Sequence, residues 1–175
     1  MSRPHDGKIP DDAATIRRLV ALARKNFASG HPVPFAAQIY VTRSGREVAT
    51  ALNRVVRGCD PTAHAEVRAI RLACRKLGKA NLAGCTLVTT CEPCPMCMTA
   101  TLFSGIGRVV YGTVVRRPDA TTPPLFDYGA KSFVDQSGFD CVVGGPVEEA
   151  LCRALVDDPR VRRYVERQGR RGVFI

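Results

Sequence analysis

The stretch Thr90-Cys91-Glu92-Pro93-Cys94-Pro95-Met96-Cys97 constrains this chain more than any other part of its sequence. Cys94 and Cys97 follow a proline at a spacing that suits the first turn of a helix. Both thiols would then project on the same side, and the helix N-terminus would favour their thiolate form. Thiolates are good zinc ligands, and two of them leave a tetrahedral zinc ion two ligands short.

A second motif upstream, Pro61-Thr62-Ala63-His64-Ala65-Glu66, supplies the obvious third ligand, His64. Three protein ligands and one open position describe a catalytic zinc site, whereas a structural site has four protein ligands. H-x-E followed by P-C-x-x-C is also the pattern of zinc-dependent nucleobase deaminases. We therefore predict one zinc ion held by His64, Cys94 and Cys97, with Glu66 as the catalytic residue.

Three other interpretations use the same cysteines. Cys91, Cys94 and Cys97 could begin an iron–sulfur site, but Thr101 stands where a fourth cysteine is required. A closed structural zinc site would take Cys91 as its fourth ligand, although Cys91 precedes the proline and lies off the predicted helix. A thioredoxin-like redox pair would leave the histidine and glutamate of the second motif without a role.

No part of the sequence has the pattern of a targeting or membrane-spanning segment. Its apolar runs fall short of the roughly 20 residues that cross a bilayer, and residues 1–10 lack the apolar core of a signal peptide. We therefore expect a cytoplasmic protein with reduced thiols and no membrane partner. The cysteines without ligand-like spacing are predicted to be small core residues: Cys59, Cys74, Cys85, Cys141 and Cys152.

The net charge of +10 at pH 7 makes RNA a candidate partner. The basic residues are nevertheless spread along the chain, and only residues 160–171 form a dense cluster. Charge alone therefore leaves RNA binding and a compositional bias of the whole proteome as open alternatives.

Hydrophobic periodicity predicts alternating helices and strands within a single domain, residues 1–175, preceded by a loose arm at 1–10. Helices are expected at residues 11–27, 60–77, 94–103, 147–155 and 160–168. Strands are expected at residues 35–41, 47–53, 87–89, 108–113 and 140–143, and residues 114–131 are predicted to be an ordered loop. This order is that of an α/β fold, with helices on both faces of a mixed sheet and both metal motifs at one sheet edge.

With these motifs, residues 30–115 resemble the cytidine deaminase superfamily, in particular its branch of guanine deaminases and tRNA-specific adenosine deaminases. The resemblance implies a three-layer α/β/α cytidine-deaminase-like fold with about five strands, one zinc ion per chain and a homodimer. It also implies that Asn53 hydrogen-bonds the substrate base and that Phe35 lines the base pocket. Ala65, through its backbone, and Glu92 are further substrate-binding residues by the same resemblance.

The reaction expected from these residues is hydrolytic deamination. Zinc lowers the pKa of water so that hydroxide is available near neutral pH. Glu66 takes the proton from this water and delivers it to a ring nitrogen, which makes the neighbouring ring carbon electrophilic. Oxygen then replaces the exocyclic amine on that carbon, and ammonia leaves.

The substrate is indicated less directly. Residues 60–66 and 91–97 look most similar to bacterial guanine deaminases, which close their pockets with C-terminal segments. Residues 156–175 are accordingly a candidate C-terminal helix, tail and lid, and the candidate lid residues are Asp127, Tyr128, Tyr164 and Phe174. Residues 105–112 and the positive charge resemble the tRNA enzymes instead.

We therefore predict a small-molecule deaminase of a purine base or nucleoside, of guanine or guanosine type. A tRNA-specific adenosine deaminase, which converts adenosine to inosine, is the alternative. A non-catalytic zinc-bearing partner subunit is a third class, and the intact Glu66 argues against it because such a subunit has no need of this carboxylate.

Overall fold

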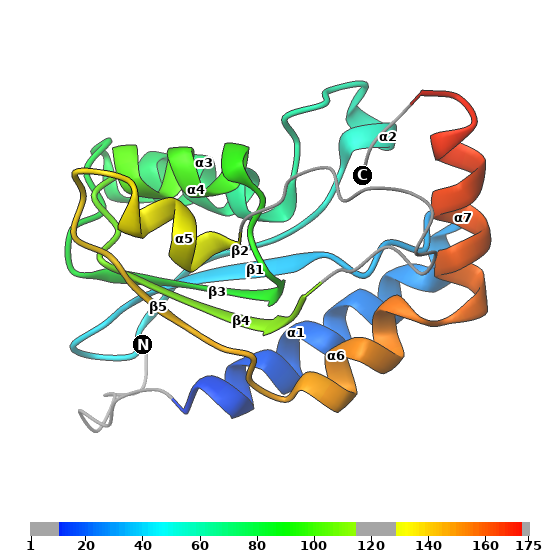
Figure 1. Cartoon of the computed structure of the whole chain (residues 1–175), viewed down its shortest axis with the longest axis horizontal. Coiled ribbons are helices and arrows are strands. Elements are labelled where there is room, and N and C mark those ends of the chain that lie inside the picture. Colours follow the sequence, from blue (N-terminus) through cyan, green and yellow to red (C-terminus); the bar gives the residue numbers. More distant parts are fainter. Residues whose placement is uncertain (1–10, 115–128, 173–175) are drawn as a thin grey trace.

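The structure, a computed structural model, describes residues 11–114 and 129–172. One sheet lies between two layers of helices (Figure 1). The strands lie in the order β2-β1-β3-β4-β5, antiparallel between β2, β1 and β3 and parallel between β3, β4 and β5. Their bounds are β1 Ala36–Val41, β2 Glu47–Leu52, β3 Cys85–Cys91, β4 Arg108–Thr113 and β5 Val142–Gly144. The predicted three-layer fold with a mixed five-stranded sheet is confirmed.

Helices cover both faces of this sheet (Figure 1). One face carries α3 (Ala65–Leu77), α4 (Pro95–Phe103) and α5 (Ala130–Asp135), and the other carries α1 (Asp12–Asn26) and α6 (Glu149–Val156). Two more helices, α2 (Val55–Gly58) and α7 (Pro159–Gly169), lie toward one end of the sheet. No helix in the described ranges combines the length and apolar character needed to cross a membrane.

Alternation along the strands divides the buried residues into two cores. On β1, Ala37 and Ile39 face the core under α3 and α4, whereas Ala36 and Tyr40 face the core under α1 and α6. Every residue of β3 is buried, as expected for a central strand covered on both faces. Because β3 ends at Cys91, the cysteine motif that follows it lies at the carboxyl end of this central strand.

Several element boundaries differ from the predicted ones. The short helix α2 lies where only a loop was expected, β3 extends beyond residues 87–89, and β5 begins at Val142. The predicted loop at 114–131 was wrong for its last residues, because α5 begins at Ala130; residues 115–128 lie outside the described part of the chain. Glu92, distant in sequence, accepts a hydrogen bond from the Ala130 amide at 2.8 Å, so α5 depends on a contact that local sequence does not reveal.

The cysteines outside the motif were only partly predicted. Cys85 and Cys152 are buried as expected, while Cys74 and Cys141 are half-buried. Cys59 is exposed, so its prediction as a core residue was wrong. It ends α2 in the left-handed conformation, with φ of 48°, where the chain turns at the surface.

A polar network ties α1 to the sheet at the edge opposite the cysteine motif. The Arg108 guanidinium donates hydrogen bonds to the Asp12 carboxylate and, at 2.9 Å, to the Tyr40 hydroxyl. Tyr40 in turn donates to Asp12 at 3.1 Å. Because these groups are partly buried, the network connects α1, β1 and β4 where water competes poorly.

Replacing Asp12 with alanine is expected to lower the free energy of unfolding by about 2 kcal/mol, because Arg108 and Tyr40 lose a charged hydrogen-bond acceptor. Chemical denaturation measures this change. Asp135→Ala is the matched control, because it removes the exposed Lys131–Asp135 pair and should change stability by less than about 0.5 kcal/mol. Equal losses in the two variants would contradict a stabilising role of the network.

Candidate active site

His64 is the residue immediately before α3, and it acts as the N-cap, with φ −60° and ψ 153°. The predicted start of this helix at residue 60 was wrong. Asp60 instead closes a turn, since its carboxylate accepts hydrogen bonds from the Thr62 amide at 2.8 Å and the Thr62 hydroxyl at 2.6 Å. The Arg54 amide then donates to the Ala63 carbonyl at 2.9 Å, which fixes the chain just before His64.

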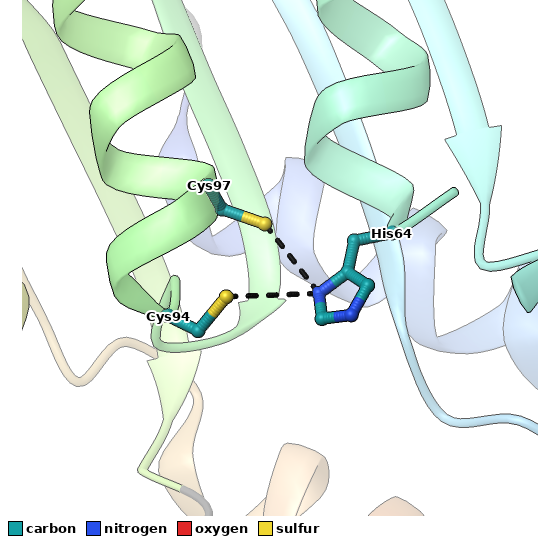
Figure 2. Close-up of side chains that lie close together, drawn as sticks. All are labelled: His64, Cys94 and Cys97. Atoms are coloured by element: carbon teal, nitrogen blue, oxygen red, sulfur yellow. Dashed lines mark hydrogen bonds between the residues drawn. The ribbon is translucent and has the colours of Figure 1, made fainter. Parts of the chain in front are cut away.

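Cys94 is likewise an N-cap, here of α4, with φ −70° and ψ 168°. Pro95 follows as the first helical residue, a position where the missing amide hydrogen has no partner to lose. Cys97 is the third residue of α4, within its first turn, and is fully buried. The two cysteines therefore come from the beginning of one helix and His64 from the beginning of another, as Figure 2 shows.

The three side chains converge on one point. The Nδ1 atom of His64 lies 3.7 Å from Cys94 Sγ and 3.5 Å from Cys97 Sγ (Figure 2). Tetrahedral zinc with ordinary Zn–S and Zn–N bond lengths would separate such atoms by about 3.6 Å. Within the described ranges, this is the only group of three or more histidine, cysteine or acidic side chains with ligand atoms close enough to hold a metal ion. The residues present therefore fit zinc.

The electrostatics of the cluster also favour metal binding. A hydrogen bond from Cys97, together with His64, lowers the pKa of Cys94 to about 4, while the same bond and burial raise the pKa of Cys97. Burial would lower the pKa of His64, but the hydrogen bond and charge of Cys94 outweigh it and raise this pKa. Two helix N-termini directed at the cluster add positive potential that stabilises thiolates.

Zinc affinity is expected to fall as pH is lowered from 8 to 6. The metal requires Cys97 as a thiolate and His64 as a neutral imidazole, and both carry raised pKa values without it, so binding must release their protons. Affinity should change about tenfold per pH unit for each proton released. Competition against a chelator at several pH values measures the slope. Cys59→Ser, at an exposed thiol outside the cluster, should keep the same slope, and an affinity independent of pH would contradict proton release.

Glu66 lies in the first turn of α3 and is only 6% exposed. The Thr89 hydroxyl donates a hydrogen bond to its Oε1 atom at 3.3 Å. Burial raises the pKa of this carboxyl, and Glu66 is near enough to Cys97 to contribute to the raised pKa of that thiol. A buried carboxyl with a raised pKa beside a metal cluster is suited to carrying a proton in both directions.

Two of the predicted substrate-binding residues meet at this same sheet edge. The main-chain amide of Asn53 donates to the Phe35 carbonyl at 3.1 Å. In its side chain, the Oδ1 atom accepts from the main-chain amide of Val55 at 3.0 Å. Phe35 is half-buried against the core, whereas Ala65 is fully buried and follows His64 directly. The roles of Asn53, Phe35 and Ala65 in binding a substrate stay predictions.

Glu92 directly follows β3, and its side chain contacts the beginning of α5. Its carboxylate accepts from the Ala130 amide at the beginning of α5, and a Cβ atom at Gly129 would lie only 2.5 Å from it. Gly129 therefore permits the close approach that anchors α5. Substrate binding by Glu92 stays a prediction.

Of the candidate lid residues, Tyr164 is the one within the described ranges; Asp127, Tyr128 and Phe174 lie outside them. Tyr164 is 3% exposed, and its hydroxyl lies 2.9 Å from the Nδ1 atom of His31. His31 and Tyr164 line a hollow together with Asn53. His31 received no role from the sequence, because nothing near it in the chain signals a partner on α7. Thr89, one of the three threonines in β3, was missed because the sequence does not show that it faces Glu66.

The family model described as the zinc-binding region of cytidine and deoxycytidylate deaminases matches residues 10–113. Among relatives, the guanine deaminase of Bacillus subtilis (strain 168) is 44% identical over 96 residues, covering 55% of this chain and 60% of the relative. The tRNA-specific adenosine deaminase of Aquifex aeolicus (strain VF5) is 39% identical over 95 residues, covering 54% and 61% respectively. The chain thus spans less than two thirds of the length of either relative.

Solved structures give the same two kinds of neighbour. A structure from a study of A-to-I editing by tRNA:A34 deaminases has a TM-score of 0.65 and 30% identity, covering 81% of this chain and 99% of that one. A guanine deaminase from Nitrosomonas europaea has a TM-score of 0.65 and 27% identity, covering 92% and 88%. The family match and the fit of the three clustered side chains confirm the prediction of a zinc centre.

Proposed function

Because the chain belongs to the family defined by the zinc-binding region of cytidine and deoxycytidylate deaminases, we propose that it is a zinc-dependent hydrolytic deaminase of a purine base or nucleoside. The guanine or guanosine type is favoured by the likeness to two guanine deaminases. The observation that carries the proposal is the cluster of His64, Cys94 and Cys97 with Glu66 buried next to it. His64, Cys94 and Cys97 are the proposed zinc ligands.

Zinc at this site supplies the Lewis acidity that makes water nucleophilic near neutral pH. Glu66 is the proposed proton carrier. Its carboxylate accepts one proton from the attacking water and delivers it to a ring nitrogen of the base. It then takes the second proton of that water from the new hydroxyl group and passes it to the amine, so that the oxygen stays on the ring as a carbonyl and ammonia leaves. The Thr89 hydroxyl, 3.3 Å from Oε1, holds the carboxylate in place during both transfers.

The base is proposed to lie against Asn53, with Phe35 and the backbone of Ala65 as neighbouring walls. The fixed position of the Asn53 side chain supports this role, because its Oδ1 atom is already held by the Val55 amide. A preoriented amide can discriminate between bases by its remaining hydrogen-bonding capacity. Tyr164, which lines the same hollow, is the proposed lid residue.

A second candidate function is deamination of adenosine in tRNA. The net charge of +10 and the likeness to tRNA deaminases, one of them matched over 99% of its chain, favour it. The presence of Glu66 beside the cluster supports catalysis over a non-catalytic partner subunit. For either activity, we propose one domain over residues 1–175 and a homodimer.

Ammonia release from a panel of bases and nucleosides, run beside an inosine assay on tRNA, tests these proposals. We expect zinc-loaded protein to release ammonia from a guanine-type purine and to leave tRNA unchanged. Inosine in tRNA without ammonia from free purines would establish the second candidate instead. Zinc-loaded protein inactive in every arm would contradict both enzymatic functions.

A further inference from the structure

The hollow next to Asn53 has a basic wall. Besides His31 and Tyr164, its lining includes Arg54 and Arg57, the residue before α2 and a residue within it. Arg54 precedes α2 with non-helical backbone angles, φ −136° and ψ 21°, and Arg57 lies within the helix, yet both side chains line the same hollow. Positive charge is thus concentrated beside the residue proposed to bind the base.

The backbone that carries these arginines is fixed to the metal site. The Arg54 amide donates to the Ala63 carbonyl at 2.9 Å, just before His64, and the Arg54 carbonyl accepts from the Gly58 amide at 2.7 Å. The distance from α2 to the zinc ligands is therefore set by main-chain hydrogen bonds. The side chains of Arg54 and Arg57 are exposed beyond this fixed backbone.

Neither arginine is neutralised by protein in the described ranges. Both side chains are exposed, and no carboxylate there lies within ion-pair distance of Arg54 or Arg57. On α7, by contrast, Arg160 and Arg162 are paired with aspartates at 2.8 Å. Two unpaired arginines on one wall repel each other, so an anion at the hollow would relieve an unfavourable charge arrangement.

Helix α7 adds a third arginine. The Arg167 guanidinium lies over the Tyr164 ring, 5.4 Å from its centre, and Tyr164 is held by His31. No carboxylate in the described ranges pairs with Arg167 either. Stacking on an aromatic ring leaves the edge of a guanidinium available for hydrogen bonds.

We propose that Arg54 and Arg57, with Arg167 at the margin, form a subsite for a phosphate group carried by the substrate. The guanidinium fork matches phosphate oxygens and can donate two parallel hydrogen bonds to them. This inference rests on the proposed function, since it takes the base to lie at Asn53. It extends the expected substrates from purine bases and nucleosides to nucleotides, either free or within an RNA strand.

The test compares Arg54→Gln/Arg57→Gln with a matched control, Arg43→Gln/Arg46→Gln. The control removes the same charge from exposed arginines in the turn between β1 and β2, at the opposite end of β2 from Asn53. For the wild type, kcat/KM should be higher for a nucleoside 5′-monophosphate than for the nucleoside. The first double variant should lose about 10- to 100-fold on the monophosphate and less than about twofold on the nucleoside, and the control should lose neither.

Binding separates failure of this inference from failure of the proposed function. Titration of zinc-loaded protein with inorganic phosphate and with guanosine 5′-monophosphate should show weaker binding in Arg54→Gln/Arg57→Gln alone, even if no turnover is found. Equal losses in the two double variants, or a monophosphate bound no better than its nucleoside, would overturn the subsite. Arg167→Gln gives a second, independent variant with a smaller expected loss.

Oligonucleotides of increasing length distinguish the two sources of phosphate. Affinity that reaches its maximum at the mononucleotide indicates a free nucleotide. Affinity that rises with length, with a salt dependence that becomes less steep in Arg54→Gln/Arg57→Gln, indicates RNA. Either result supports the subsite, whereas a salt dependence reduced equally by the control would attribute the effect to overall charge.

Discussion

Replacing Glu66 with glutamine is expected to abolish deamination while leaving zinc bound. Glutamine has nearly the same size and still accepts the hydrogen bond from Thr89, but it cannot take a proton from water and return it. Because Glu66 is proposed to carry both proton transfers, kcat should fall by at least about 10³-fold. Ammonia release and the zinc content of the same sample measure the two halves of this expectation.

The matched control for Glu66→Gln is Glu47→Gln. Glu47 is exposed at the beginning of β2, far along the strand from Asn53, so its replacement should change neither turnover nor zinc content. Substantial turnover by Glu66→Gln would remove Glu66 from the proposed mechanism. Loss of zinc in that variant would mean that the carboxylate supports the metal site rather than proton transfer.

Replacing Cys97 with serine is expected to empty the zinc site and to stop turnover. Structural zinc sites with four protein ligands bind the metal with about 10–16 kcal/mol, so one ligand there is worth roughly 3 kcal/mol, or about 10²-fold in affinity, and we expect a loss of at least this size for one thiolate of a three-ligand site. Zinc should also raise the melting temperature of the wild type but not that of Cys97→Ser, because only a bound metal stabilises the folded state. Metal analysis after dialysis and thermal unfolding with added zinc measure both effects.

Cys91→Ser separates a three-ligand site from a closed four-ligand site. Cys91 is buried but is not a member of the His64, Cys94 and Cys97 group, and burial, followed by the charge of Glu66, holds its pKa well above the usual value. Serine at position 91 should therefore leave zinc binding close to that of the wild type. If Cys91→Ser loses zinc as Cys97→Ser does, the site is closed by four protein ligands and cannot leave a position open for water.

The metal cluster could be predicted from sequence because its signals are local. Residue type, spacing and the neighbouring proline identify Cys94 and Cys97 as candidate ligands. In the same way, a local apolar pattern predicts the strand at 108–113. The start of α3 could not be predicted in the same way, since an aspartate followed by a proline, as at Asp60, is common both at helix starts and in turns. In the structure, Asp60 forms a turn, because its carboxylate accepts hydrogen bonds from the Thr62 amide and hydroxyl.

Contacts between distant segments set the limit of what sequence reveals. Tyr164 and His31 are in contact although they lie 133 positions apart in the chain. Likewise, α5 begins at Ala130, whose amide donates a hydrogen bond to the Glu92 carboxylate. Each side chain alone has many possible partners, and tertiary packing selects among them. The wall of arginines was missed for the same reason, because Arg54 and Arg57 join Tyr164 only after α2 and α7 come together.

His64 and Cys94 each stand just before a helix, 30 positions apart in the chain. A metal ion bound by both residues would therefore cross-link the beginnings of α3 and α4, in addition to its proposed role in catalysis. It closes a loop that includes α3 and β3, and this lowers the chain entropy of the unfolded state if the link persists there. Chelation should thus loosen the beginnings of α3 and α4 before it affects α1 or α6, so that metal supply controls the rigidity of one face of the sheet.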